Sequence, residues 1–324
     1  MRKTISFTLL IAMIALLSVT FAGCGSKTEF EKMLESEYGF ELAFEDDFDG
    51  DSVDYNKWRV GYTAGAGEDG ALRRAGYYED SADTIIVKDG TLTIRTLYKN
   101  GQYGEGWYTS WLETSVADSV KSEAPIKDRE NYEGFEATYG YFEIRCIAPP
   151  CEGIWSAFWM MPDSPAMGAE EDEFPGGADG IEIDVMESPY YNQLLTRDTV
   201  LHVLHADGYA NTKTERSPAN YVRNMYSEFH TYGVLWTEDE YVFYIDGKET
   251  WRTSHVVNGE VLGVSEVPEY LLVTVEVGGY NENGIPVPGK NPDGSAFWCG
   301  DPNANDKTKS YDFVIDYVRA YTAV

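Results

Sequence analysis

The chain has 324 residues, and 25 lysines and arginines against 55 aspartates and glutamates give it a formal net charge of −30. Hydrophobic residues make up 43% of the sequence, which is enough for a sizeable core and excludes global disorder. A charge this negative argues against nucleic acid or an anionic membrane surface as a partner. It also weakly disfavours a polyanionic substrate, although a local basic cleft would override that effect. Four cysteines are too few for a disulfide framework.

The first 23 residues have the pattern of a secretory signal peptide. Arg2 and Lys3 form a short basic start, an apolar run follows over residues 5–22, and small residues stand directly before Cys24. This ending resembles a bacterial lipobox, in which the cysteine is lipidated and becomes the first residue. An uncleaved transmembrane anchor is the alternative, because the run is nearly long enough to span a bilayer.

With either kind of anchor, we expect the rest of the chain to lie outside the cytoplasm. The lipobox resemblance implies that lipid on Cys24 holds the protein at the bacterial cell membrane surface. The polar stretch 24–39 is then predicted to be a tether. No linker interrupts residues 40–324, which are predicted to form one catalytic domain.

Apolar runs separated by Gly, Asp and Asn turns predict that this body is built from many short strands. Asp89-Gly90 and Asp246-Gly247 each stand between two such runs, which is the signal of a β-hairpin. No long segment has a 3.6-residue apolar period. We therefore expect an all-β sandwich or jelly roll rather than an α/β fold. Further strands are expected at 139–147, 154–160, 181–187, 199–205, 231–236, 270–277 and 312–321, and surface loops at 115–134, 162–180 and 281–310.

Three acids, Glu182, Asp184 and Glu187, lie on one predicted strand. The spacing alone is weak evidence in a chain this acidic. Glu182 and Asp184 share a face because strand side chains alternate, and one β-bulge at Val185-Met186 would return Glu187 to that face. The two glutamate Cα atoms would then lie roughly 13 Å apart, at ~3.3 Å per residue. Side chains that lean inward would bring the carboxyls to about 5–6 Å, close to the separation in retaining glycosidases.

The acidic segment resembles the Glu-x-Asp-x-x-Glu signature of glycoside hydrolase family 16. Residues 139–145 resemble the Tyr-Gly-x-Phe-Glu-x-Arg strand of that family, and residues 153–159 resemble its Gly-x-Trp-x-Ala-x-Trp strand. Residues 229–247 and 316–321 resemble its paired hairpin strands and its closing strand. The resemblance covers roughly residues 43–322, and the combination is far more specific than any one motif.

The resemblance implies a concanavalin-like jelly roll with a substrate cleft across its concave face. It also implies retaining endo-hydrolysis of β-linked glucans or galactans, as in laminarinases and lichenases. Carried over residue by residue, Glu182 would be the nucleophile and Glu187 the general acid and base. Asp184 would hydrogen-bond the nucleophile and tune its charge. Clustered carboxyls have separated pKa values, so that one can stay protonated as the acid.

Aromatic side chains and one histidine are the candidates for binding a polysaccharide. Trp155 and Trp159 are four residues apart on one strand and point the same way, either as platforms for sugar rings or as core aromatics. His205 resembles a cleft histidine of the family, although a lone histidine is more often structural. Tyr190 follows the acidic strand. It is expected either to line the subsites or to lie in an exposed loop. Trp298 is a candidate contact at the cleft rim, in a loop rich in Gly and Pro.

The cysteine spacing leaves one pairing open. Cys146 and Cys151 bracket a Pro-Pro turn and could form a small loop disulfide in an oxidising location, with Cys299 left free. We expect no zinc site, because one further cysteine and no nearby histidine are available.

Calcium is the one ion that the family resemblance suggests. Many family members carry a structural calcium on the convex side, and Glu45 and Asp316 occupy roughly the positions of its ligands. Acids are so common in this chain that chance explains the two residues nearly as well. The reaction itself requires no cofactor.

The leading functional hypothesis is a surface-anchored endo-β-glycanase that hydrolyses β-1,3-glucan or mixed-linkage β-1,3/1,4-glucan by double displacement. A β-galactan of the agar, carrageenan or host-glycan kind is the alternative. Residues 72–80 lack the Asn-x-Glu-x-Gln stretch of laminarin-type relatives, and Ala206 stands where many relatives have Trp. The net charge disfavours sulfated galactans. A non-catalytic glycan-binding jelly roll is a second alternative, and a transporter's binding lipoprotein a third that the missing helices disfavour. We expect a monomer.

Overall fold

The computed structural model describes residues 27–62, 72–116, 124–162, 176–189, 191–192, 194–207, 212–279, 288–291 and 293–323. The predicted signal peptide, Cys24 and Tyr190 lie outside these residues, as do parts of the three predicted loops. Within the described ranges, none of the helices combines the length and the apolar character needed to cross a membrane.

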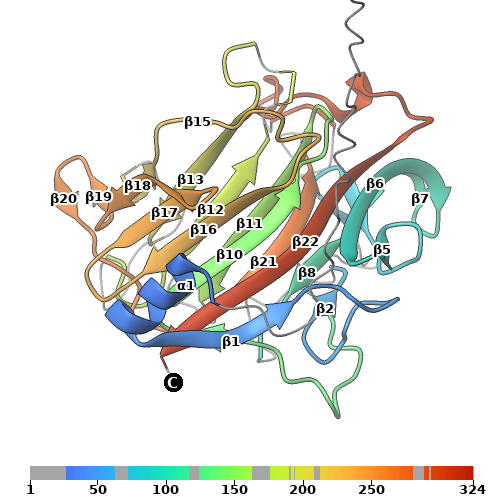
Figure 1. The fold of residues 1–324 in the computed structure, drawn as a ribbon. Coiled ribbons are helices and arrows are strands. Elements are labelled where there is room, and N and C mark those ends of the chain that lie inside the picture. The colour runs from blue at the N-terminus through green and yellow to red at the C-terminus, as the bar shows by residue number, and fades with distance from the viewer. Residues whose placement is uncertain are drawn as a thin grey trace, which may run out of the picture.

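Two large, mostly antiparallel sheets lie face to face and form the predicted β-sandwich (Figure 1). The first sheet runs in the order β18 (Lys248–Thr253), β17 (Tyr241–Ile245), β16 (His230–Trp236), β10 (Gly140–Ile147), β22 (Ser310–Ala323), β6 (Thr91–Gly101), β7 (Gly104–Thr109), β4 (Gly76–Tyr78) and β3 (Leu72–Arg73). Two further strands pair with members of this row: β1 (Phe40–Asp46) with β22, and β5 (Ile85–Lys88) with β6.

The second sheet carries the acidic strand near its middle. Its order is β14 (Thr214–Arg216), β13 (Thr199–His205), β12 (Glu182–Ser188), β11 (Ile154–Pro162), β21 (Glu269–Val277), β8 (Trp111–Glu113) and β2 (Arg59–Val60). β15 (Asn220–Tyr221) pairs with β13, and β9 (Glu136–Ala137) pairs with β21. A separate small hairpin joins β19 (Val256–Val257) to β20 (Glu260–Val261), and a short 3-10 helix, η3 (Pro302–Ala304), precedes β22.

The main core lies between the two sheets because alternate residues of each strand point inward. Phe142 and Ile144 of the first sheet and Phe158 and Ile183 of the second are fully buried in one apolar cluster. Both predicted hairpin turns are present: in Asp89-Gly90 and Asp246-Gly247, φ is positive at both residues. These are the turn residues that match the right-handed twist of paired strands. The jelly-roll prediction is confirmed.

Part of the stretch that we expected to be a tether is folded onto the first sheet. Helix α1 (Glu29–Met33) begins at a capping box formed by Thr28 and Glu31, and continues into a π-helical turn, η1 (Leu34–Tyr38). Leu34 is fully buried, and the ring of Phe30 lies 4.7 Å from that of Tyr141. Figure 1 shows α1 beside β1, over this sheet. The segment is polar in composition because it contributes few residues to the interface.

The structure has Cys146, Cys151 and Cys299 as buried free thiols, so the Cys146–Cys151 pairing that the spacing left open is not formed. Cys146 lies in β10, which continues to Ile147, and Cys151 lies in the loop that follows. Both side chains belong to the core cluster between the sheets.

The two acids that the resemblance suggests for calcium are each engaged by an arginine. Glu45 accepts a 2.7 Å hydrogen bond from Arg319, and Asp316 forms an ion pair with Arg145. A carboxylate paired with a guanidinium is a poor ligand for a cation, so this arrangement does not fit calcium. Calcium binding at these two residues stays a prediction.

Candidate active site

A β-bulge in β12 brings the three acids to one face, as the sequence predicts. Asp184 pairs with Val203 and Glu187 with Leu201, so that Val185 and Met186 together stand opposite the single residue between them on β13. The pairing with β11 also skips Val185. Val185 and Met186 both point into the main core, while the three acids line a cleft on the opposite side of the sheet.

The residue opposite the bulge is His202, and its side chain holds the bulge in place. Its ring is fully buried and stacks on Phe243, with ring centroids 4.7 Å apart. Nδ1 lies 2.7 Å from the carbonyl oxygen of Val185, and Nε2 lies 3.0 Å from the hydroxyl of Thr250. Because the carbonyl only accepts, Nδ1 carries the proton and donates it to the extra residue of the strand. No motif or spacing in the sequence indicates this role.

The cleft has a volume of about 440 Å³, which is in the usual range for ligand sites. Four of the five predicted binding residues line it, namely Trp155, Trp159, His205 and Trp298, and the fifth, Tyr190, lies outside the described residues. The structure therefore brings together side chains that are more than 100 positions apart in the sequence.

The tryptophans differ in how they are held. Trp159 packs edge-on against Trp111, with centroids 5.5 Å apart, and its indole N–H donates a 3.0 Å hydrogen bond to Thr274. Trp155 and Trp298 form a second edge-to-face pair at 4.7 Å. Trp298 is 42% exposed, although it is a large aromatic residue. Partly exposed rings that are fixed by neighbours suit stacking against a ligand.

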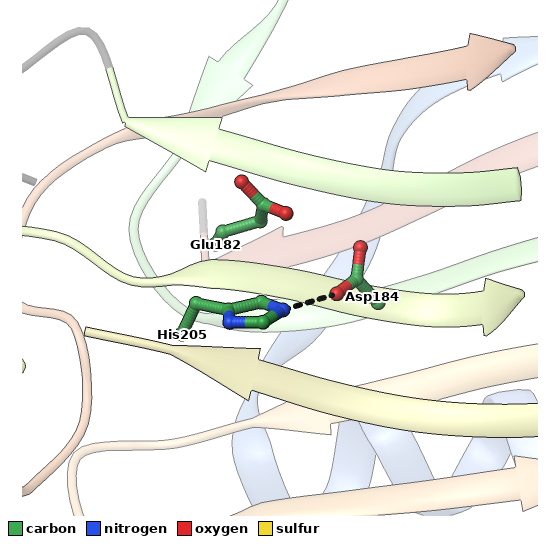
Figure 2. Close-up of side chains that lie close together, drawn as sticks. All are labelled: Glu182, Asp184 and His205. Atoms are coloured by element: carbon green, nitrogen blue, oxygen red, sulfur yellow. Dashed lines mark ion pairs between the residues drawn. The ribbon is translucent and has the colours of Figure 1, made fainter. Parts of the chain in front are cut away.

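Figure 2 shows Glu182 and Asp184 on the same side of β12, with His205 of β13 beside them. Nε2 of His205 lies 3.6 Å from a carboxyl oxygen of Asp184, and Nδ1 lies 2.8 Å from the hydroxyl of Thr214. One donor atom from each of Glu182, Asp184 and His205 fits within 4.8 Å, a set that would also suit a small divalent cation. Such a cation would compete with any reaction that uses these carboxylates.

Burial and mutual repulsion raise the pKa values of two of the acids. Burial, and then the charges of Glu187 and Glu182, hold the pKa of Asp184 well above its usual range. Burial, and then the charge of Glu182, raise the pKa of Glu187 to about 8. Burial, and then the charge of Arg216, lower the pKa of His205 to about 3. At neutral pH the cleft therefore holds a protonated Glu187 and an uncharged His205.

Three arginines line the cleft, and no motif predicted a role for them there. Arg73 and Arg74 both contact Glu276 through ion pairs, and the Arg74 guanidinium lies 5.1 Å from the centre of the Trp155 ring. Burial works against the charged form of Glu276, but the two arginines lower its pKa overall. The third arginine, Arg216, lies at the other edge of the cleft. Two adjacent arginines in so acidic a chain were the one sequence signal available.

The three acids lie in a part of the chain that a protein-family model matches. The model of the glycosyl hydrolases family 16 matches residues 130–283, a stretch that includes β12, Trp155, Trp159 and His205. This match supports the family resemblance drawn from the motifs. Members of that family are enzymes that hydrolyse glycosidic bonds.

Among curated proteins, the endo-1,3-1,4-beta-glycanase ExsH of Rhizobium meliloti (strain 1021) is 30% identical over 192 residues, covering 59% of this chain and 32% of the relative. The glucan endo-1,3-beta-glucosidase A1 of Niallia circulans is 25% identical over 299 residues, covering 87% and 38%. Beta-porphyranase B of Zobellia galactanivorans is 23% identical over 258 residues, covering 75% of each. The chain spans about a third of the length of the first two relatives.

Among solved structures, SCLam, a non-specific endo-beta-1,3(4)-glucanase of family GH16, aligns with a TM-score of 0.62 at 22% identity. The alignment covers 89% of this chain and 92% of that one. The laminarinase catalytic domain from Thermotoga petrophila RKU-1 aligns with a TM-score of 0.57 at 24% identity, over 87% and 98%. At these identities the likeness establishes the fold.

The bulge geometry predicts that His202 controls the environment of Glu187. In His202→Leu, the carbonyl of Val185 loses its buried donor, and unfolding should become easier by about 1–3 kcal/mol. With the bulge relaxed, Glu187 should gain solvent and its pKa should fall from about 8 toward its ordinary value. Carboxyl-resolved ¹³C NMR and thermal unfolding measure both effects.

His202→Asn is the control, because its amide N–H can replace Nδ1–H. An equal fall in the pKa of Glu187 in both variants would contradict a role for this hydrogen bond.

The raised pKa of Glu187 also predicts a pH-dependent stability. The carboxyl titrates near 4.5 in the ordinary case and at about 8 here, so the folded state binds this proton more tightly than the unfolded chain does. The resulting stabilisation is complete below about pH 4.5 and is lost as the pH rises through about 8. Glu187→Gln removes the titration, and its Tm should exceed that of the wild type by at least about 5 °C at pH 8 and by little at pH 4.5.

The matched control for this measurement is Glu238→Gln, a change at an exposed glutamate outside the cleft. Its Tm difference from the wild type should be small and flat over the same pH range. A Tm difference for Glu187→Gln that is independent of pH would show that the proton is not held on this carboxyl.

Proposed function

We propose that this protein is a retaining endo-β-glycanase that hydrolyses β-1,3-glucan or mixed-linkage β-1,3/1,4-glucan. The observation that carries the proposal is the bulge, which turns Glu182 and Glu187 to the same cleft while the charge of Glu182 helps to keep Glu187 protonated. Two carboxyl groups of one cleft, one ionised and one holding a proton, are the requirement for acid-assisted cleavage of a glycosidic bond.

In the first step, Glu187 donates its proton to the glycosidic oxygen while Glu182 attacks the anomeric carbon. The bond between that carbon and the glycosidic oxygen breaks, the leaving sugar departs with the proton as an alcohol, and a covalent glycosyl-enzyme remains. In the second step, the ionised Glu187 takes a proton from water, which attacks the anomeric carbon and releases Glu182. Asp184 lies on the same face as Glu182, and burial followed by the charges of Glu187 and Glu182 raises its pKa, which favours the protonated form that can donate a hydrogen bond to the nucleophile. Trp155, Trp159 and Trp298 line the cleft and provide stacking surfaces for sugar rings.

The choice of glucan follows the names of two matched relatives, an endo-1,3-1,4-beta-glycanase and a glucan endo-1,3-beta-glucosidase. A β-galactan is the second candidate. Arg73, Arg74 and Glu276 occupy the cleft beside Trp155, and one matched relative is named as a porphyranase.

We also propose that lipid on Cys24 anchors the protein at the outer side of the bacterial membrane, as the lipobox-like ending of residues 21–24 indicates. The first described residues, at the N-terminal cap of α1, lie only a few positions after Cys24. The described body would therefore sit close to the membrane, on a short connection of ~3.5 Å per residue at most.

The function is tested with a panel of β-glucans and β-galactans, measured for released oligosaccharides. The wild type should cleave at least one polymer internally, and Glu182→Gln should reduce the rate by about 10³-fold or more. NMR of the fresh product should show the β-anomer first, since double displacement retains configuration. Glu238→Gln serves as a control and should keep full activity. Binding without cleavage in the wild type would leave a glycan-binding protein instead of a hydrolase.

The anchor is tested by fractionating bacteria that express the full chain. The wild type should be found in the membrane fraction, and mass spectrometry should detect acyl groups on an N-terminal Cys24. Cys24→Ala should abolish the acylation, whereas Ser26→Ala should not. A protein that retains residues 1–23 in the membrane fraction would instead support the transmembrane alternative.

A further inference from the structure

Arg216 carries a positive charge to one edge of the cleft. It is the last residue of the edge strand β14, where it pairs with Val203, and Val203 in turn pairs with Asp184. These cross-strand neighbours point to the same face of the sheet, and all three line the cleft. With ~4.8 Å between strands, β14 lies about 10 Å from the acidic strand.

Among the residues that the structure describes, Arg216 makes no ion pair, and its side chain is exposed to solvent. The nearest acids along the chain have other partners. Glu215 points away and accepts hydrogen bonds from the hydroxyl of Thr253 and the amide of Val256, and Asp207 pairs with Lys213. Arg73 and Arg74, by contrast, are held by Glu276 at the other side of the cleft.

Protonation reduces the negative charge that the cleft presents to Arg216 at neutral pH. The groups that face Arg216 from the neighbouring strands are His205 on β13 and the three acids on β12. Burial and the charge of Glu182 raise the pKa of Glu187 to about 8, so that this carboxyl is mostly protonated, and His205 is uncharged. The pKa of Asp184 is raised in the same direction by burial and by the charges of Glu187 and Glu182. The guanidinium therefore faces the solvent in the cleft with five N–H donors available to a ligand.

We propose that Arg216 binds an oxyanion on the glycan, either a sulfate ester or the carboxylate of a uronic acid, at a subsite on the β14 side of the scissile bond. A guanidinium recognises both groups through paired N–H donors in one plane. The inference rests on the proposed function, and it adds to the β-glycan an anionic group that this subsite would recognise. It also replaces the expectation from net charge, because the recognition depends on one local contact.

The test measures binding in the Glu182→Gln background, so that no substrate is consumed. Calorimetric titrations use laminarin, laminarin oxidised to carboxylates at C6, laminarin sulfated at C6, and the neutral and sulfated galactans agarose and porphyran as oligosaccharides. At least one anionic form should bind about tenfold or more tightly than its neutral counterpart, a difference of about 1.4 kcal/mol. Arg216→Gln should remove this preference and leave binding of the neutral form unchanged.

Arg223→Gln is the matched control, because Arg223 is an exposed arginine that does not line the cleft. It should keep the preference for the anionic glycan. Comparing the titrations with carboxylated and with sulfated glycans identifies which oxyanion the site prefers. Equal binding of neutral and anionic forms by the parent, or an equal loss of both in Arg216→Gln, would overturn the proposal.

The wild-type cleavage assay separates this inference from the proposed function. Cleavage of a neutral glycan, without an Arg216-dependent preference for anionic glycans, would contradict the inference and still support the hydrolase function. An Arg216-dependent preference in binding, without cleavage of any polymer, would contradict the hydrolase function and still support the anion subsite. In Arg216→Gln, a shifted pH profile with unchanged selectivity would show that the arginine acts on the acids and not on the ligand.

Discussion

One additional residue in β12 determines the chemistry of the whole sheet. Without the bulge, Glu187 would point between the sheets, where an ionised carboxyl without a partner costs several kcal/mol. With it, Val185 and Met186 both enter the core and Glu187 joins Glu182 and Asp184 in the cleft. The crowding raises two pKa values, which is unfavourable for the folded state at neutral pH. The apolar core between two large sheets and the His202 hydrogen bond keep this arrangement in place.

Most of the sandwich could be predicted from the sequence, because long strands leave a repeated pattern. The strands expected at 154–160 and 270–277 correspond to β11 (Ile154–Pro162) and β21 (Glu269–Val277), and the Asp-Gly turns fixed two hairpins. The bulge was predictable for a geometric reason, since acids at 182, 184 and 187 share a face only if one residue is inserted. Two-residue strands such as β3 (Leu72–Arg73) were not predicted, because alternation has no meaning over so short a length.

The parts that sequence patterns missed depend on contacts between distant segments. The helix at residues 29–38 is polar in composition, and Leu34 is its one fully buried residue. Glu276 is an acid in an otherwise largely apolar strand, and its ion-pair partners Arg73 and Arg74 lie some 200 residues earlier in the chain. The Cys146–Cys151 pairing, which the spacing left open, is absent from the structure for a related reason: spacing in sequence does not reveal the distance and direction between two thiols.

The net charge of −30 and an arginine aimed at an anionic ligand are compatible once distance is considered. At physiological ionic strength the Debye length is about 8 Å, so acids elsewhere on the surface are largely screened from a ligand in the cleft. A guanidinium in direct contact with a sulfate or carboxylate is much less affected, because water and salt are displaced from between them. The surrounding acids would then slow the approach of a polyanion at low salt, while Arg216 would determine how tightly the bound chain is held. Global charge therefore governs encounter, and the local contact governs which glycan is retained.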